Sequence, residues 1–282
     1  MILNSKDLVK YFKPFIVFVA GINFSGCNYI TLPVKTSRLQ SSEVSGKALT
    51  AKLSANYQTL STIRIVQDAT SIPPKDSPVE TDLPDLGTGF DGGITLWPRL
   101  ELFGSTVEGI SMAGIKYQLL GDTSEASRQG NISLAIASAY GISKTEDKGS
   151  NETIDVNLPL ANPHTNQSPN LHWTFSNKYR INDFAVIIGR RSTDRTLVYG
   201  GPFFSHYRID GEFTQTYDGT YNEYPMKNRG NLFGANYAFE VSFLKNRRLT
   251  LTSELIYTWM HWSRMHGWES DIGFSLAFGY SF

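Results

Sequence analysis

The chain offers few residues whose types and spacing could perform chemistry. It holds one cysteine and five histidines, and none of them falls into a zinc-protease, P-loop or nucleophile-elbow motif. His261 and His266 are five residues apart, but a zinc site there would need further ligands. Ser205 and His206 are adjacent, so on one strand their side chains would point to opposite faces and could not act together. We therefore expect no catalytic residue, no metal site and no cofactor.

Charged residues on the polar faces of alternating segments say more about function than the cysteine, histidines and serines do. In an extended chain successive side chains point to opposite faces. Eight titratable residues share the face of the small and polar residues: Lys52, Lys116, Lys178, His206, Arg208, Asp210, Glu240 and Glu254. If the segments close into a barrel, this face lines the lumen. The charges would then either pair and fill the interior or line a channel that selects solutes by charge and size.

The last twelve residues show most clearly which elements carry these charges. From Asp271 to Phe282 every even position is bulky and apolar, and every odd position is small or polar. Such a segment forms a strand with one apolar face and one small, hydrophilic face. An aromatic residue at the end of this strand suits the rim of a barrel whose outer face contacts lipid.

This terminal strand resembles the last strand of bacterial outer-membrane β-barrel proteins, which the assembly machinery reads as an insertion signal. Tyr280 and Phe282 occupy the apolar and terminal aromatic positions of that signal, and Ala277 stands where the family has Gly. The run G-F-D-G-G-I-T-L-W-P-R-L-E-L-F-G, followed by G-I-K-Y-Q-L-L-G, resembles the opening hairpins of a group of uncharacterised outer-membrane barrels. The resemblance implies a location in the bacterial outer membrane. It also implies two partners, outer-membrane lipid and the barrel assembly machinery.

The amino-terminal residues 1–26 are typical of a signal peptide. Three lysines precede the apolar run 15–24, which is shorter than the roughly 20 apolar residues that a membrane-spanning helix needs. Ser25-Gly26-Cys27 resembles the bacterial lipoprotein box, although Phe24 stands where that family usually has Leu. The resemblance implies lipidation at Cys27. The alternative is an ordinary signal peptide in which Cys27 has no role.

Three parts follow from this reading. Residues 1–26 are the signal peptide, and residues 27–45, which have little periodicity, form a flexible lipid-anchored tether. Residues 46–282 form an outer-membrane β-barrel. A soluble sandwich is the less favoured alternative, because its solvated faces would be rich in Lys and Glu. The polar faces here are instead rich in Gly, Ala, Ser and Thr.

The fold class we expect is all-β, a transmembrane antiparallel up-and-down barrel. Eleven segments alternate clearly and a twelfth, 152–158, is weaker; the clear ones are 47–58, 87–96, 99–105, 110–120, 131–142, 171–179, 184–191, 195–210, 230–243, 248–262 and 271–282. Bacterial single-chain barrels have even strand numbers, so we expect about twelve strands. Ten is the alternative, with 171–191 running as one strand. We expect long outer loops at 59–86, 143–151 and 211–229.

Composition excludes some functions and leaves others open. Lys+Arg and Asp+Glu are equal at 26 each, so the chain lacks the basic balance of a nucleic-acid-binding protein. We expect a pore or transporter for small solutes. A closed barrel that binds partners through its outer loops is the alternative, and a lipid-modifying barrel enzyme is less favoured. The oligomeric state stays open.

The lipoprotein box leads to the first prediction. We expect the mature protein to carry a diacylglycerol group and an acyl chain on Cys27, detected by mass spectrometry as added mass on the amino-terminal peptide. Cys27→Ala should abolish this added mass. An unmodified mature amino terminus at another residue would refute the lipoprotein assignment.

The terminal aromatic residue leads to the second prediction. Deletion of Phe282 should reduce the amount of heat-modifiable, folded barrel in the membrane fraction, because the assembly machinery would lose its terminal contact. Deletion of one residue between positions 67 and 79, within the expected outer loop 59–86, serves as the control. Equal insertion of both deletion variants would show that Phe282 is incidental to assembly.

Overall fold

The computed structural model describes residues 30–66, 80–151, 171–217, 219–243, 248–263, 265 and 267–282. The described residues form eleven strands: β1 (Ile30–Val34), β2 (Ala51–Val66), β3 (Glu80–Trp97), β4 (Leu100–Val107), β5 (Ile110–Leu120), β6 (Ile132–Asn151), β7 (Leu171–Thr193), β8 (Thr196–Tyr217), β9 (Thr220–Phe243), β10 (Leu249–Trp262) and β11 (Glu269–Ser281). None of the described residues forms a helix long and apolar enough to cross a membrane.

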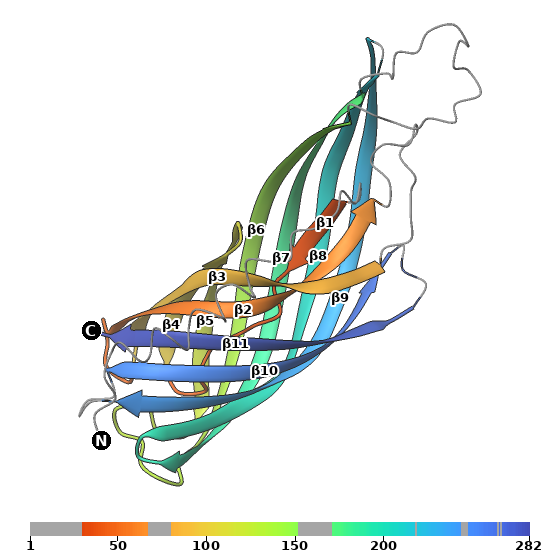
Figure 1. The fold of residues 1–282 in the computed structure, drawn as a ribbon. Coiled ribbons are helices and arrows are strands. Elements are labelled where there is room, and N and C mark those ends of the chain that lie inside the picture. Colours follow the sequence, from red (N-terminus) through yellow and green to blue (C-terminus); the bar gives the residue numbers. More distant parts are fainter. Residues whose placement is uncertain are drawn as a thin grey trace, which may run out of the picture.

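Strands β2 to β11 close into a barrel. Each pairs antiparallel with the next along the chain, and β2 pairs with β11 as well as with β3 (Figure 1). The expected up-and-down β-barrel is therefore confirmed, with ten strands in the closed ring. Residues 171–191 belong to the single strand β7, as in the ten-stranded alternative. The doubtful segment 152–158 lies outside the described residues.

Two ends of the barrel can be distinguished. The carboxyl terminus and the short β3–β4 and β7–β8 connections lie at one end, which we call the inner end because periplasmic turns are short in such barrels. At the opposite, outer end, β4 and β5 join through Glu108 and Gly109, which have φ angles of 43° and 77°. Positive φ at both central residues is what a two-residue hairpin turn requires.

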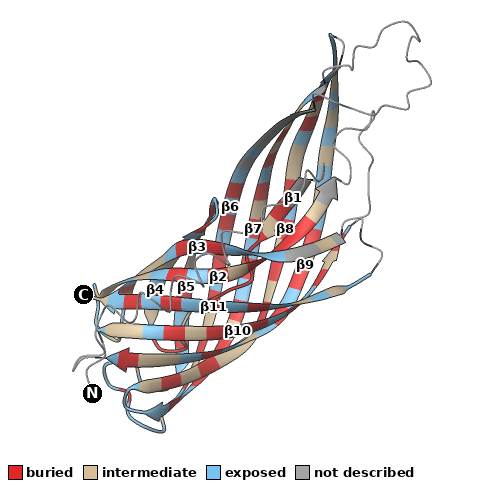
Figure 2. Cartoon of the chain, in the orientation of Figure 1, coloured by how far each residue is buried: buried red, intermediate tan, exposed pale blue. Residues whose placement is uncertain are grey.

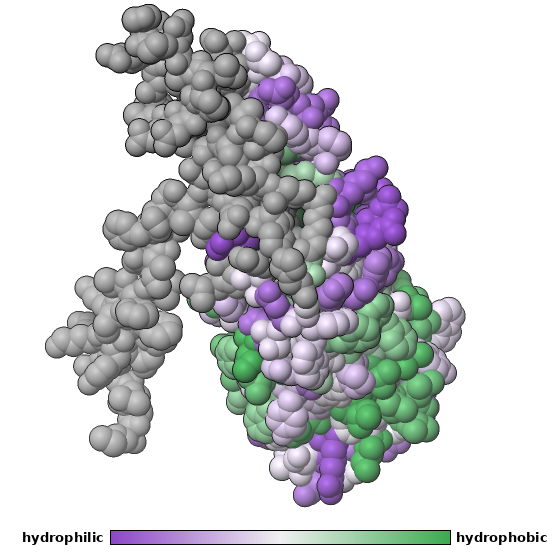
Figure 3. Space-filling model, turned by 90° about the vertical axis from the view of Figure 1, so that its right-hand side faces the viewer, coloured by the Kyte–Doolittle hydropathy of each residue, from purple (hydrophilic) through white to green (hydrophobic). Residues whose placement is uncertain are grey.

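Large apolar side chains are exposed on the strands of the inner part of the barrel, and we call them the apolar belt; they include Phe90, Ile115, Phe233, Leu255 and Phe274. Figure 3 shows one face of this belt. Buried and exposed residues alternate along its strands, as on β11, and the exposed members are mostly large and apolar (Figure 2). Near the outer edge of the belt, the aromatic rings of Phe204 and Phe233 lie 4.7 Å apart and those of Phe233 and Trp268 lie 5.7 Å apart. Aromatic side chains are typical of the level where hydrocarbon meets the lipid headgroups.

Strands β6 to β9 extend well beyond this belt at the outer end (Figure 1). They contain 20, 23, 22 and 24 residues, more than a membrane crossing of about ten residues requires. The expected outer loop 211–229 is therefore wrong, because most of it lies in the hairpin of β8 and β9. In this extension Phe175 and Phe213 point inward and are buried. The apolar face has changed sides, because outside the membrane the outer surface meets water.

Strand β1 lies against the outer half of β2. Residues Ile30–Val34 pair with Ser61–Val66 of β2, whereas β11 pairs with β2 only through Lys52–Gln58. The strand thus covers an edge of β2 that β11 leaves unpaired, and an unpaired edge is a liability in a sheet. From Val34 the chain continues through the barrel interior to Gly46, and the turn at 46–50 leads into β2.

The flexible tether expected for residues 27–45 is not what the structure shows for residues 30–45. After β1 the side chains of Lys35–Arg38 and Ser42–Ser45 are buried inside the barrel. The stretch lacks periodicity in sequence because the barrel wall contacts it on all sides. Cys27 and the expected signal peptide lie outside the described residues.

Candidate functional site: the occupied lumen

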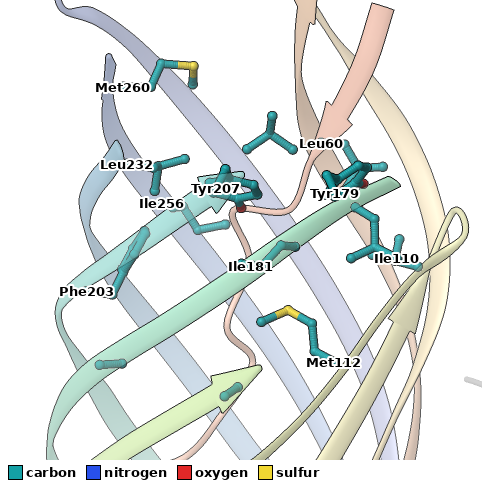
Figure 4. Close-up of a cluster of buried hydrophobic side chains, with 14 of the residues drawn as sticks. Leu60, Ile110, Met112, Tyr179, Ile181, Phe203, Tyr207, Leu232, Ile256 and Met260 are labelled. Carbon is teal, nitrogen blue, oxygen red and sulfur yellow. The ribbon is translucent and has the colours of Figure 1, made fainter. Parts of the chain in front are cut away.

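The barrel lumen contains residues 35–46, which we call the luminal segment. Around β1 and the start of this segment the lumen is apolar, with Leu32 and Val34 buried against inward side chains of the outer half. Figure 4 shows the chain passing among Tyr179, Tyr207 and Leu60, which come from β7, β8 and β2. The hydroxyls of Tyr179 and Tyr207 donate hydrogen bonds to the carbonyl oxygens of Pro33 and Lys35, at 3.1 and 2.9 Å.

Glu254 of β10 holds the middle of the luminal segment. Its carboxylate accepts the Ser37 hydroxyl at 2.7 Å and the backbone N–H groups of Arg38 and Leu39 at 3.2 to 3.4 Å. Leu39 has a φ angle of 43°, and such a left-handed residue lets consecutive amides point toward one anion. Asn236 of β9 donates to the same carboxylate at 2.5 Å. Glu254 therefore receives donors from both the segment and the wall.

Arg38 attaches the segment to the opposite part of the wall. Its guanidinium pairs with Asp183 of β7 at 2.6 Å and donates to the Ser205 hydroxyl of β8 at 2.7 Å. The guanidinium carbon lies 4.0 Å from the centre of the Phe203 ring, in a cation–π contact. The side chains of Arg38 and Asp183 are 6% and 8% exposed, so water screens this pair little.

A second ion pair holds the inner end of the segment. Glu43 pairs with Arg191 of β7, and both side chains are 1% exposed. The Glu43 carboxylate also accepts the Ser127 hydroxyl at 3.1 Å and the Asn131 amide at 2.9 Å, so its lone pairs are satisfied. Removing one partner of such a buried pair typically costs 3 to about 5 kcal/mol, because the remaining charge stays buried.

Uncharged polar contacts complete the attachment. The hydroxyls of Ser42 and Ser133 lie 2.7 Å apart, which places the segment directly against β6. The backbone N–H of Val44 donates to the Gln118 side-chain oxygen at 2.8 Å, and its carbonyl accepts the N–H of Ser124. The segment is thus hydrogen-bonded along much of its length, as buried backbone requires.

Three charges gather on the wall below the segment. The Glu101 carboxylate of β4 binds the ammonium groups of Lys52 and Lys116, at 3.2 and 3.1 Å. Lys116 also donates to the Ser41 carbonyl oxygen at 3.2 Å, so this cluster contacts the segment. Among the described residues, no hydrogen bond or ion pair holds the carboxylate of Glu240. Two ammonium groups share one carboxylate, and a second carboxylate has no direct partner, so both signs of charge are present on this part of the wall.

Glu240 and this cluster line a polar cavity beneath the segment. It has a volume of about 110 Å³, and its lining includes Leu39, Lys52, Glu101, Glu240 and Thr252. A wider cavity of about 780 Å³ adjoins it at the inner end. Both cavities are lined by Lys52, Ser124 and Ser281, so the inner half of the lumen opens toward the periplasmic end.

Four of the eight residues expected in the lumen lie there. Lys52, Lys116, Glu240 and Glu254 point inward, and the first three line the same cavity. The other four point outward: Lys178, His206, Arg208 and Asp210. On β7 and β8 the inward residues beyond the belt are mostly apolar, including Tyr179, Ile181 and Tyr207, although Asn177 and Gln215 are also buried there. The assignment of inward and outward positions from the sequence was wrong there, because it assumed that apolar side chains face outward along the whole strand.

Sequence reasoning missed several luminal residues. Arg38 and Glu43 were assigned to the tether, and Asp183, Arg191 and Glu101 were not singled out. A signal existed for Arg191, which shares a face with Gly189 and Ile187 on one alternating strand. No periodic signal could have identified the residues of the luminal segment, because the chain between β1 and β2 forms no helix or strand.

The remaining predicted residues lie on the outer surface or outside the described part. Tyr280 and Phe282 are exposed on the belt, with ring centres 5.0 Å apart. The His261 ring lies 5.3 Å from the Trp268 ring, near the outer aromatic edge of the belt. His266 and Cys27 lie outside the described residues. No group of three or more His, Cys, Asp or Glu that could hold a metal occurs in the described part.

Comparisons with known proteins give similarities to solved structures alone. No family model matches the chain. A search of curated proteins finds no match either. Ail of Yersinia pestis, solved with the heparin analogue sucrose octasulfate, has a TM-score of 0.34 and 11% identity, over 84% of this chain and 100% of that one. The CymD monoaromatic hydrocarbon channel has a TM-score of 0.30 and 8% identity, over 84% and 89%. Neisserial surface protein A has a TM-score of 0.23 and 9% identity, over 83% and 96%.

These scores are too low to carry an argument about function. The membrane assignment follows from the barrel itself. Strands can span a bilayer only in a closed barrel, because every backbone group must be hydrogen-bonded there. This chain has a closed ring of strands and an exposed apolar belt with aromatic edges. The protein is an outer-membrane β-barrel whose lumen is occupied by its own chain.

The contacts of Glu254 lead to a prediction. Glu254→Ala should release the middle of the segment, because four donors lose their acceptor at once. Limited trypsin digestion should then cut after Lys35 or Arg38, which are buried in the parent protein. The matched control is Glu223→Ala, on the outer extension. Equal resistance of Glu254→Ala and the parent would show that this carboxylate does not hold the segment.

Proposed function

We propose that the protein is an outer-membrane conduit for small polar solutes and that the luminal segment closes it. The observation that carries this proposal is that the charged wall binds a segment of the chain. Lys52 and Lys116 pair with Glu101 along the wall, but other wall charges pair with the segment instead. Asp183, Arg191 and Glu254 all bind groups of the segment. The segment is attached to β1 at one end and to β2 at the other, so it can move aside but cannot leave. Such a movement would open a channel lined by charged and hydroxyl side chains, which suits polar solutes.

The two parts of the amino-terminal stretch differ in how costly they are to move. Strand β1 buries Leu32 and Val34, and each such side chain contributes about 1.5 to 3 kcal/mol. The luminal segment is held mainly by hydrogen bonds and ion pairs, for which water can substitute once it enters the lumen, whereas no solvent substitutes for the buried apolar contacts of β1. Residues 35–46 are therefore the part that moves, and β1 is the fixed anchor.

The cavity beneath the segment indicates the class of solute. It presents the Lys52 ammonium and the partnerless Glu240 carboxylate to one space of about 110 Å³. A small solute carrying both a positive and a negative group complements these charges. The lining also contains apolar side chains such as Leu39, Phe103 and Leu197, so it can accommodate a small apolar part of such a solute.

A disulfide lock tests the closure. The Ser42 and Ser133 hydroxyls are 2.7 Å apart, so cysteines at both positions should form a disulfide between the segment and β6. Cys27→Ala removes the only native cysteine from this background. In planar bilayers the oxidised S42C/S133C protein should be silent, and reduction should bring back the discrete conductance steps of the parent.

Two controls are needed to interpret an absence of conductance in the bilayer. The single variants Ser42→Cys and Ser133→Cys should conduct equally with and without reductant, and heat-modifiable mobility should show that each protein is folded. Silence of the parent, of the reduced double variant and of Glu254→Ala would contradict the conduit.

The alternative is a closed barrel that acts at the surface. The extension of β6 to β9 favours it, because it offers a large folded surface outside the membrane. Under this alternative, release of the segment produces no conductance, and a partner binds the extension.

A further inference from the structure

The outer faces of β7, β8 and β9 carry a row of arginines just beyond the aromatic edge of the belt. Arg180 is directly opposite Arg208 on β8, and Arg208 is directly opposite Arg229 on β9. Neighbouring strands are about 4.8 Å apart, so three guanidinium groups are attached within roughly 10 Å of one another. All three side chains are on the outer surface, half-buried for Arg180 and exposed for the other two.

The next outward-facing row is also basic. Lys144 of β6 is opposite Lys178, Lys178 is opposite Asp210, and Asp210 is opposite Lys227. The two rows together contain six basic side chains and one acid, and we call them the basic patch. Asp210 binds Arg208 at 3.4 Å. Among the described residues, no hydrogen bond or ion pair holds the side-chain charges of the other five: Lys144, Lys178, Arg180, Lys227 and Arg229.

Other charged residues nearby do not neutralise the patch. The following row carries Glu146 on β6 and Glu212 on β8, and Glu223 lies further out on β9. A hydrogen bond with Glu223 and its negative charge raise the pKa of Glu212, so these two acids interact with each other. His206, between the patch and the belt, pairs with Asn231 at 2.8 Å. Like charges directly opposite each other across strands are destabilising, so the row costs stability unless an anion occupies it.

The height of the patch on the barrel identifies the anion. On β7 the outward residues from the belt are Phe184, Asn182 and then Arg180. Four residues along a strand tilted by about 40° rise roughly 10 Å above the aromatic edge. Aromatic edges lie at the headgroup level, and arginine side chains can reach several ångströms back toward it. The guanidinium groups can therefore reach back to the level of the lipid phosphates in the outer leaflet.

We infer that the basic patch binds the phosphate groups of an anionic lipid in the outer leaflet. Arginine suits this task because its planar donors match phosphate oxygens in pairs. The site faces the surrounding lipid and is separate from the lumen. A bound lipid there would fix the barrel's height in the membrane and relieve the repulsion within the arginine row.

Lipid binding to the purified full-length mature protein in neutral detergent tests the inference. Native mass spectrometry would measure the affinity for lipid A bearing two phosphates. A basic residue near a membrane surface contributes about fivefold to binding, so the triple variant R180Q/R208Q/R229Q should bind on the order of a hundredfold more weakly. The matched control R190Q/R195Q/R248Q removes three exposed arginines at the inner end and should change the affinity less than about twofold. Equal affinities of the triple variant and the parent would overturn the inference.

Two further readouts separate lipid binding from other roles. Without lipid the triple variant should melt at a higher temperature than the parent, and it should lose the stabilisation that lipid A gives the parent. A lower melting temperature without lipid would assign the arginines to the fold and overturn the inference. Binding of soluble inositol hexakisphosphate as tight as that of lipid A would also overturn it, because the patch would then be a site for soluble polyanions and not for a lipid.

Discussion

A charge that faces the inside of a narrow barrel must find a partner, and this constraint shapes the molecule. Buried polar groups are almost always hydrogen-bonded, because burying an unpaired charge costs several kcal/mol. Asp183, Arg191 and Glu254 point into the lumen, and the amino-terminal chain supplies Arg38, Glu43 and backbone amides to them. Wall and segment are therefore one polar network. Neither part is satisfied without the other.

The membrane imposes a second division along the barrel axis. Within the belt, apolar side chains face lipid and the interior is polar, as on β11. Beyond the belt, β6 to β9 face water on the outside, and their interior becomes apolar around residues such as Phe175 and Phe213. The apolar side chains of β6 to β9 therefore point outward within the belt and inward beyond it. This change places the polar contacts of the segment in the inner part of the lumen and its apolar anchor, β1, in the outer part.

The sequence was sufficient for the barrel and for part of the lumen. Period-two alternation within the belt correctly placed Lys52, Lys116, Glu240 and Glu254 inside, because lipid forces every second residue to be apolar. It failed for Lys178, His206, Arg208 and Asp210, which lie beyond the hydrocarbon layer of the bilayer. The alternation could not identify the luminal segment. That segment is surrounded by the barrel wall, so its side chains do not divide into a polar and an apolar face. Those contacts depend on tertiary closure, which brings Arg38 to Asp183, 145 positions along the chain.

Hydrogen–deuterium exchange of the mature protein in lipid nanodiscs is the most direct test of the occupied lumen. The amides of Arg38, Leu39 and Val44 donate to Glu254 and Gln118, so this account predicts that they exchange far more slowly than the exposed turn at Gly109, although faster than the paired strands β7 and β8, because the segment opens and the strands do not. Complete exchange of these three amides within seconds, while the strands stay protected, would show that the segment does not reside in the lumen.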